Sequence, residues 1–282
     1  MSVELISKLR EMTGAGIKDC NNALKEANND IEQAVKILRE KGIASAVKRA
    51  DRSAKQGTVV ARISADKKTG VLVELNCETD FVAKTDNFKK LANDIAVHVE
   101  KSSSQDNILE QKYDAAQTVK DLITNAIATI GENIVLKRAV KFTSTGVISS
   151  YIHGEFGTLG VLVNFECSDE VAKSEKFQTL TKEIAMQIAA VSPSYVKRDQ
   201  VPQEELAKEK EIYVKQLQEE GKPANIIEKI VVGKLDKYYS QVCLLEQPYM
   251  RDTTGKQKVQ EIINQAGAGI SVKEFARFKI GE

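Results

Sequence analysis

Apolar positions in the first 41 residues recur at helical spacing. Leu5, Leu9 and Met12 fall on one stripe, and two further groups of apolar residues continue at the same spacing. Residues that suit an N-cap or a first helical turn stand near the three starts, and Gly42 is expected to end the third helix. These first-turn residues are Ser2, Asp19 and Asp30. The pattern predicts a bundle of three short helices.

A polar and net positive stretch follows the bundle, from Lys48 to Lys55. Such a charge run suits a linker or a solvated fourth helix. We therefore expect a first domain of bundle and linker over residues 1–54, with a boundary near residue 55.

The most informative pattern is an internal repeat. The segment Gly70–Cys77 (GVLVELNC) returns 90 residues later as Gly160–Cys167 (GVLVNFEC). After one deletion the match continues, with Val82–Phe88 against Val171–Phe177. A match of this length is difficult to produce by chance, so the sequence predicts two copies of one structural unit.

Each copy begins with two segments of alternating polarity joined by a short Gly-containing turn, which favours a β-hairpin. A helical pattern follows each hairpin, at 86–100 and 175–190, and matching final strands lie at 134–142 and 270–278. The expected hairpin strands are 57–63, 70–77, 146–153 and 158–167.

We predict an α+β fold in which the bundle precedes two duplicated subdomains, 55–142 and 143–282. Each subdomain is an antiparallel three-stranded sheet with helices on one face. The second copy also carries an insertion, 193–245, with two helical patterns separated by Gly221-Lys222-Pro223. Gly ends helices and Pro begins them, so the insertion is expected to form an antiparallel helical hairpin. A projecting hairpin would contact a partner or a second copy of the chain.

Composition narrows the function classes. The chain has 282 residues, 42% of them hydrophobic and 29% charged, which is typical of a globular protein. A formal charge of +1 provides no global cationic field for nucleic acid. No apolar run is long enough to span a membrane, and Met1–Glu4 does not resemble the start of a signal peptide. We expect a cytoplasmic protein without a membrane or a direct nucleic-acid partner.

Cysteine and histidine are too few and too scattered for a metal or redox site. Four cysteines lie far apart without a CxxC motif, and the histidines are His98, expected on a helix surface, and His153. A thiol enzyme would have to use Cys77 and Cys167, but their equivalent places at strand ends favour shared packing. We expect no cofactor, no metal and no enzymatic chemistry.

The two copies differ where the second strand meets its helix. Copy one has Thr79-Asp80-Phe81, whereas copy two has Ser168-Asp169-Glu170. Phe81 either caps the local core or projects from a rigid corner as an interface anchor. Asp80 either assists that anchor or serves as the N-cap of a helix beginning near residue 82.

Four segments in this order resemble bacterial elongation factor Ts. They are Thr13–Cys20 (TGAGIKDC), Asn76–Lys84 (NCETDFVAK), Ile130–Ile134 (IGENI) and Tyr151–Gly154 (YIHG). The resemblance implies a ubiquitin-associated-like (UBA-like) bundle, a duplicated core and a coiled-coil hairpin. It implies a guanine-nucleotide exchange factor that binds elongation factor Tu in its GDP-bound and nucleotide-free states.

The resemblance also implies roles for individual residues. Asp80 and Phe81, with neighbouring Thr79 and Val82, would intrude beside the partner's magnesium site. Ile130 and Gly131 would lie at the same interface, Ile17 and Lys18 would carry the bundle's contact, and His153 would face the partner's third domain. The family often has Met-Met-Asp-Cys-Lys-Lys where this chain has Ile17-Lys18-Asp19-Cys20-Asn21-Asn22. A nucleic-acid or protein adaptor is the alternative function, with a basic arm of Lys48, Arg49, Arg52 and Lys55.

Overall fold

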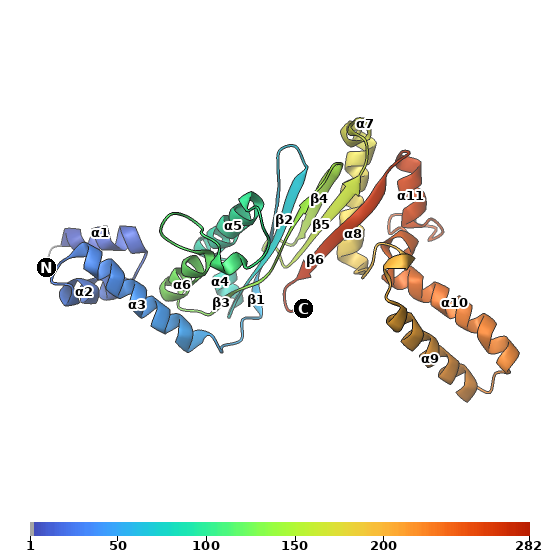
Figure 1. The fold of residues 1–282 in the computed structure, drawn as a ribbon, viewed down its shortest axis with the longest axis horizontal. Coiled ribbons are helices and arrows are strands. Elements are labelled where there is room, and N and C mark those ends of the chain that lie inside the picture. Colours follow the sequence, from blue (N-terminus) through green and yellow to red (C-terminus); the bar gives the residue numbers. More distant parts are fainter. Residues whose placement is uncertain (1–2) are drawn as a thin grey trace.

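The computed structural model describes residues 3–282, so Ser2, an expected first-turn residue, lies outside the described part. The molecule is elongated (Figure 1). A helical bundle forms one end, two sheets packed against each other lie in the middle, and a helical hairpin projects at the other end. The predicted α+β class is confirmed.

The bundle consists of α1 (Val3–Thr13), α2 (Ile17–Glu26) and α3 (Ile31–Arg49). Its core contains Leu9, Cys20, Leu24 and other buried apolar side chains. Asp30 caps α3 by accepting a hydrogen bond from the Gln33 amide at 3.0 Å, as the sequence predicts, and Asp19 lies in the first turn of α2.

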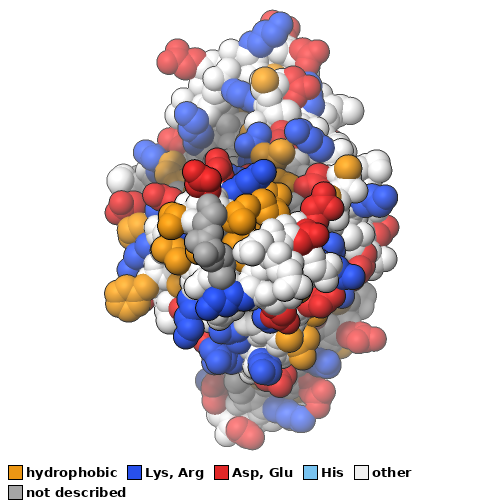
Figure 2. Space-filling view, turned by 90° about the vertical axis from the view of Figure 1, so that its left-hand side faces the viewer, with side chains coloured by type: hydrophobic (Ala, Val, Ile, Leu, Met, Phe, Trp, Pro, Cys, Tyr) orange, Lys and Arg blue, Asp and Glu red, His pale blue; other side chains and the backbone are white. Residues whose placement is uncertain are grey.

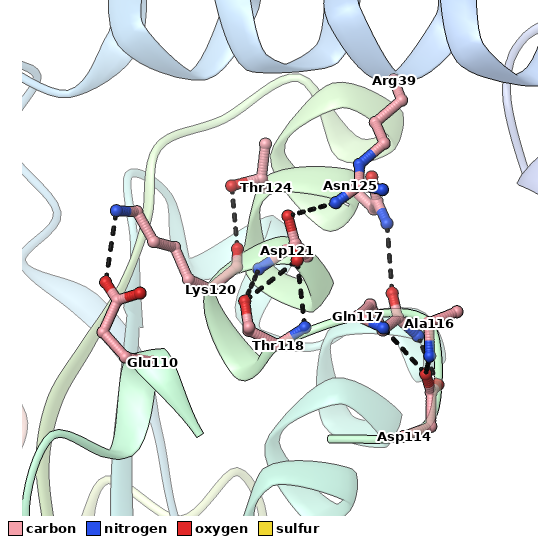
Figure 3. Close-up of polar contacts among 10 residues, drawn as sticks. All are labelled: Arg39, Glu110, Asp114, Ala116, Gln117, Thr118, Lys120, Asp121, Thr124 and Asn125. Atoms are coloured by element: carbon pink, nitrogen blue, oxygen red, sulfur yellow. Dashed lines mark hydrogen bonds and ion pairs between the residues drawn. The ribbon is translucent and has the colours of Figure 1, made fainter. Parts of the chain in front are cut away.

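The expectation that Gly42 ends the third helix is wrong. Helix α3 continues to Arg49 and so includes Lys48 and Arg49, the first two residues of the stretch expected to be a linker or a fourth helix. The rest of that stretch, up to Lys55, is not helical and links the bundle to β1 (Gln56–Ile63). A Cβ atom at residue 42 would lie 3.2 Å from the Cβ of Ala128 on α6 (Val119–Ile130). Glycine therefore allows two helices to approach closely, and Arg39 joins Asp121 across the same contact at 2.9 Å (Figure 3).

The first subdomain has sheet order β1-β2-β3, all antiparallel. Its helices α5 and α6 cover one face, and their apolar residues form a core with β2. The elements are β1 (Gln56–Ile63), β2 (Thr69–Cys77), α4 (Asp80–Ala83), α5 (Asp86–Lys101), a 3₁₀ turn η1 (Ile108–Glu110), α6 and β3 (Ile134–Thr143).

The second subdomain repeats this plan with order β4-β5-β6. Both sheets have an irregular register at the same place of the repeat, between Glu74 and Leu75 in β2 and between Asn164 and Phe165 in β5. The predicted duplication is thus visible in the backbone. The elements are β4 (Val147–His153), β5 (Leu159–Glu166), α7 (Asp169–Lys173), α8 (Glu175–Val191), α11 (Val259–Ala266) and β6 (Ser271–Lys279).

The two sheets pack against each other through the faces that carry no helices. A Cβ atom on Gly70 would lie 2.6 Å from Ile148 and 3.0 Å from Leu162, and one on Gly160 would lie 2.5 Å from Val59 and 2.9 Å from Leu72. Since these positions correspond in the repeat, the contact is reciprocal. The shared core, which the sequence analysis missed, comprises Val59, Leu72, Phe142, Ile148, Leu162 and Phe278.

The insertion forms the expected antiparallel helical hairpin, α9 (Gln203–Glu219) and α10 (Ala224–Val242). Leu217, Ile227 and Val231 are buried between the two helices. At the base, Glu205 on α9 accepts hydrogen bonds from the hydroxyls of Tyr195 and Tyr238. Short 3₁₀ turns flank the pair, η2 (Arg198–Gln200) and η3 (Leu244–Glu246).

Candidate functional site

The chain turns sharply where β2 ends and α4 begins. Thr79 has extended backbone angles, and its hydroxyl accepts a hydrogen bond from the Val82 amide at 3.3 Å, so Thr79 is the N-cap of α4. Asp80 is therefore the first helical residue, and its interpretation as the N-cap is wrong. Copy two is built alike, with Ser168 capping α7.

Two carboxylates hold this corner against the segment after α6. Glu132 accepts hydrogen bonds from the amides of Glu78 and Thr79 at 3.1 and 3.0 Å, and from the Thr79 hydroxyl at 2.7 Å. In return Glu78 accepts one from the Asn133 amide at 2.7 Å. Hydrogen bonds to charged acceptors are stronger than neutral ones, so the corner is firmly fixed. Glu132 lies in the IGENI segment, but nothing in the sequence marked it as the residue that fixes the corner.

Phe81 points away from the protein on this fixed corner. It is 79% exposed, which makes it the most exposed large hydrophobic side chain among residues 3–282. The interpretation of Phe81 as a local core residue is wrong. Its neighbour Val82 is half-buried and packs on the first subdomain's core.

Asp80 carries its charge at the surface beside the ring. Its carboxylate lies 2.5 Å from the Lys84 ammonium one helical turn later. The hydrogen bond from Lys84 holds the pKa of Asp80 below its usual value, so the carboxylate is ionised at neutral pH.

The Ile130–Gly131 turn lies next to this corner, because Glu132 follows it directly. Ile130 is half-buried against the first subdomain's core, and Gly131 ends α6 with φ 88°. The Gly131 carbonyl accepts a hydrogen bond from Arg49 Nε at 2.9 Å. The turn thus joins the end of the bundle's last helix to the corner.

The bundle presents Ile17 and Lys18 in the first turn of α2, where both are exposed. The preceding turn lies near the end of α6, because a Cβ at Gly14 would lie 3.8 Å from the Thr129 side chain. A cavity of about 620 Å³ lies between the bundle and α6, beside the contact of α3 with α6, and its lining includes Met12, Gly16, Leu38, Arg39, Gly42 and Thr129. Figure 2 shows hydrophobic side chains gathered near the middle of this end of the molecule, among charged ones.

His153 belongs to the second subdomain, at the end of β4. It is exposed, and its Nδ1 lies 2.9 Å from the Tyr151 hydroxyl. The turn that follows contacts the first subdomain, since the Val59 amide donates to the Gly157 carbonyl at 2.7 Å. The structure thus places the His153 turn against β1, the strand that pairs with β2.

The thiols lack the properties of nucleophiles. Burial raises the pKa of Cys77 to about 12 and also raises the pKa of Cys167, whereas reactive thiols have lowered values. His98 is half-buried rather than on open surface, with Nε2 2.9 Å from the Gln111 side-chain oxygen. Within residues 3–282, acidic, His and Cys side chains nowhere form a group of three that could hold a metal ion. In the same range, no helix is both long and apolar enough to cross a membrane.

The fold is that of an α+β protein with two repeated halves. In the first half, one aromatic ring is exposed on a fixed corner between a strand and a helix. The profile of the family "Elongation factor TS" matches residues 78–282. Relatives named elongation factor Ts are 44% identical in Clostridium botulinum and Aquifex aeolicus and 47% identical in Halothermothrix orenii. Their alignments cover all of this chain and 93%, 98% and 93% of the relatives.

The chain belongs to the elongation factor Ts family. It is a translation elongation factor, and the role of this family is guanine-nucleotide exchange on elongation factor Tu. That role is release of a bound nucleotide rather than catalysis of a chemical reaction.

Proposed function

We propose that Asp80 and Phe81 enter elongation factor Tu beside the magnesium and phosphate site and so promote release of GDP. The observation that carries this proposal is the exposure of Phe81, 79%, on a corner that Glu132 holds from below. An apolar ring kept in water gains free energy only when a partner covers it, about 1.5–3 kcal/mol for a fully buried Phe. A fixed corner also lowers the conformational entropy lost on binding.

The mechanism is differential binding. A GTPase holds GDP through a phosphate-binding loop, a lysine and a magnesium ion. If Phe81 is buried only after the partner's magnesium region has moved, the factor binds the nucleotide-free state more tightly than the GDP state. By linkage, it must then weaken GDP binding by the same ratio. Ionised Asp80 would assist by hydrogen-bonding partner groups or by disturbing the magnesium shell.

Other contacts would extend the interface on both sides of the corner. Ile17 and Lys18 on the bundle, together with Ile130 and Gly131, would engage the partner's nucleotide-binding domain. Thr79 and Val82 would mainly hold the corner, because the first caps α4 and the second is half-buried. His153, exposed in the second subdomain, would face the partner's third domain.

Each proposed domain would have its own role. Residues 1–54, which we propose to be UBA-like, would serve as a docking unit, and 55–142 and 143–282 would form the two-lobed core. The 193–245 hairpin would be a short coiled coil that contacts the partner or a second copy. As a partner of elongation factor Tu, the protein would act in the cytoplasm.

The adaptor alternative is less well supported. Of the four residues of the basic arm, Arg49 donates to the Gly131 carbonyl and Arg52 lies 3.5 Å from the Glu78 carboxylate. Cations used in internal contacts are less available for phosphates. Lys48, Arg52 and Lys55 are exposed, and of these three Arg52 already faces an acid.

The test is release of labelled GDP from elongation factor Tu. Catalytic amounts of the protein should accelerate release with multiple turnovers. Unchanged release at saturating protein would refute the proposal. Competition by unlabelled RNA should leave the rate unchanged, and strong inhibition by RNA would favour the adaptor.

A further inference from the structure

Lys84, the residue after α4, is surrounded by groups from both subdomains. Its ammonium lies 2.5 Å from the Asp80 carboxylate and 5.9 Å from the centre of the Phe81 ring. The same ammonium lies 5.4 Å from the ring centre of Phe156, which comes from the turn between β4 and β5. One cation therefore contacts the acid and the ring of the corner, and a ring of the other half.

Phe156 is itself held in place against the first subdomain. Its carbonyl accepts a hydrogen bond from the Thr58 hydroxyl at 2.9 Å. Gly157 has φ +63°, and a Cβ there would lie 2.5 Å from the Val59 carbonyl oxygen, so only glycine fits this close approach. A second cation, Lys89 on α5, lies 5.3 Å from the Phe156 ring centre.

We propose that Lys84 and Phe156 form a latch that orients the Phe81 ring before the partner arrives. Both are positioning residues, because neither is required to touch the partner. Cations are attracted to the faces of aromatic rings, so an ammonium held by Phe156 and Asp80 restricts the orientations open to Phe81. The inference rests on the proposed function of Phe81 and adds that the second subdomain sets the orientation of a ring in the first.

A purely stabilising role for Lys84 fits the structure less well. Lys84 and Asp80 have side chains 43% and 51% exposed, and ion pairs this exposed contribute little to folding stability. The contacts instead fix the relative positions of three groups, because the Asp80 carboxylate and the rings of Phe81 and Phe156 all lie around the one Lys84 ammonium. Loss of the latch should therefore change the order of the ring more than the stability of the protein.

The direct test uses fluorine NMR of the free, full-length protein with 4-fluorophenylalanine at position 81. Lys84→Met and Phe156→Leu should each shift or narrow the position-81 resonance, while Lys84→Arg, which keeps a cation, should retain it. The matched control is Lys234→Met, which removes a comparable cation–ring contact, 5.3 Å from the Tyr213 ring centre, in the hairpin. A resonance unmoved by Phe156→Leu, or moved equally by Lys234→Met, would overturn the latch.

Exchange kinetics supply the second measurement. Each single latch variant should lower the apparent second-order rate constant for GDP release about two- to five-fold, the size of an exposed cation–ring contact. The double variant should be no worse than the worse single variant, because the two residues act through one contact. If Phe81→Ala slowed exchange but the latch variants did not, the latch alone would fail. If Phe81→Ala itself left exchange unchanged, the proposed function would fail, whatever the fluorine signal showed.

Discussion

Replacement of Phe81 by Ala separates binding from folding. In the free protein the ring is 79% exposed, so little apolar burial is lost, and unfolding free energy should change by no more than about 0.5 kcal/mol. In the complex the exposed four-fifths of the ring becomes available for burial. Scaled from the usual value for Phe, that burial is worth about 1–2.5 kcal/mol, or roughly a 5- to 70-fold loss of exchange efficiency.

The assay pairs urea unfolding with stopped-flow release of labelled GDP. Glu170→Ala is the matched control, because Glu170 occupies the equivalent exposed position of the second copy and should leave both measurements unchanged. Phe88→Ala is the control for the loss of a buried ring. Phe88 is fully buried in the same subdomain, so its truncation should cost about 3–5 kcal/mol of stability.

One outcome would refute an interface role for Phe81. If Phe81→Ala destabilised the protein as much as Phe88→Ala while exchange per folded molecule stayed normal, the ring would be structural. The proposal would then move to Asp80 and the Ile130–Gly131 turn.

Three further changes have expected outcomes. Glu132→Ala should lower the unfolding free energy, measured in urea, by about 1–3 kcal/mol and should also slow exchange, because it leaves the amides of Glu78 and Thr79 without their acceptor. An unchanged urea midpoint would show that other contacts hold the corner. Replacing 203–242 by a short linker should preserve the sheets, as measured by circular dichroism, because the segments on either side of the hairpin already meet, with the Leu244 amide 2.9 Å from the Tyr195 carbonyl. Global unfolding would place the hairpin in the core. Cys77 keeps its proton in the folded state up to about pH 12, while the unfolded thiol loses it near pH 9, so its stabilising contribution is complete below pH 9 and falls above it. Between pH 8 and 10 the unmodified protein should lose about 1 kcal/mol more unfolding free energy than Cys77→Ala, and equal losses would contradict the raised pKa.

The sequence predicted features that rest on local patterns. Alternating segments gave the strands to within one or two residues, and Gly221-Lys222-Pro223 correctly marked the turn between α9 and α10. Comparison of the two copies drew attention to Phe81, because the copies share their packing residues and differ at this exposed position. Whether Phe81 was buried could not be decided, because a phenylalanine after a strand suits either place.

What the sequence could not predict depends on distant contacts. Gly42 is a helix terminator by propensity, yet it lies inside α3 because Ala128 packs against it. The hydrogen bond from the Thr79 hydroxyl to Glu132 and the contact of the Lys84 ammonium with the Phe156 ring join residues far apart in the chain, and no local spacing signals them. Face-to-face packing of the sheets was missed for the same reason, although Gly70 and Gly160 recur at equivalent positions.

The reciprocal contact between the sheets has a consequence for symmetry. A single copy would expose this apolar face and could bury it by pairing with an identical chain. In such a homodimer, however, every residue occurs twice. Covalent joining of the copies makes the pairing independent of concentration and frees each half to differ from the other. This chain uses that freedom at its corners, where one half displays Phe81 and the other Glu170, an inequality that two identical subunits cannot possess.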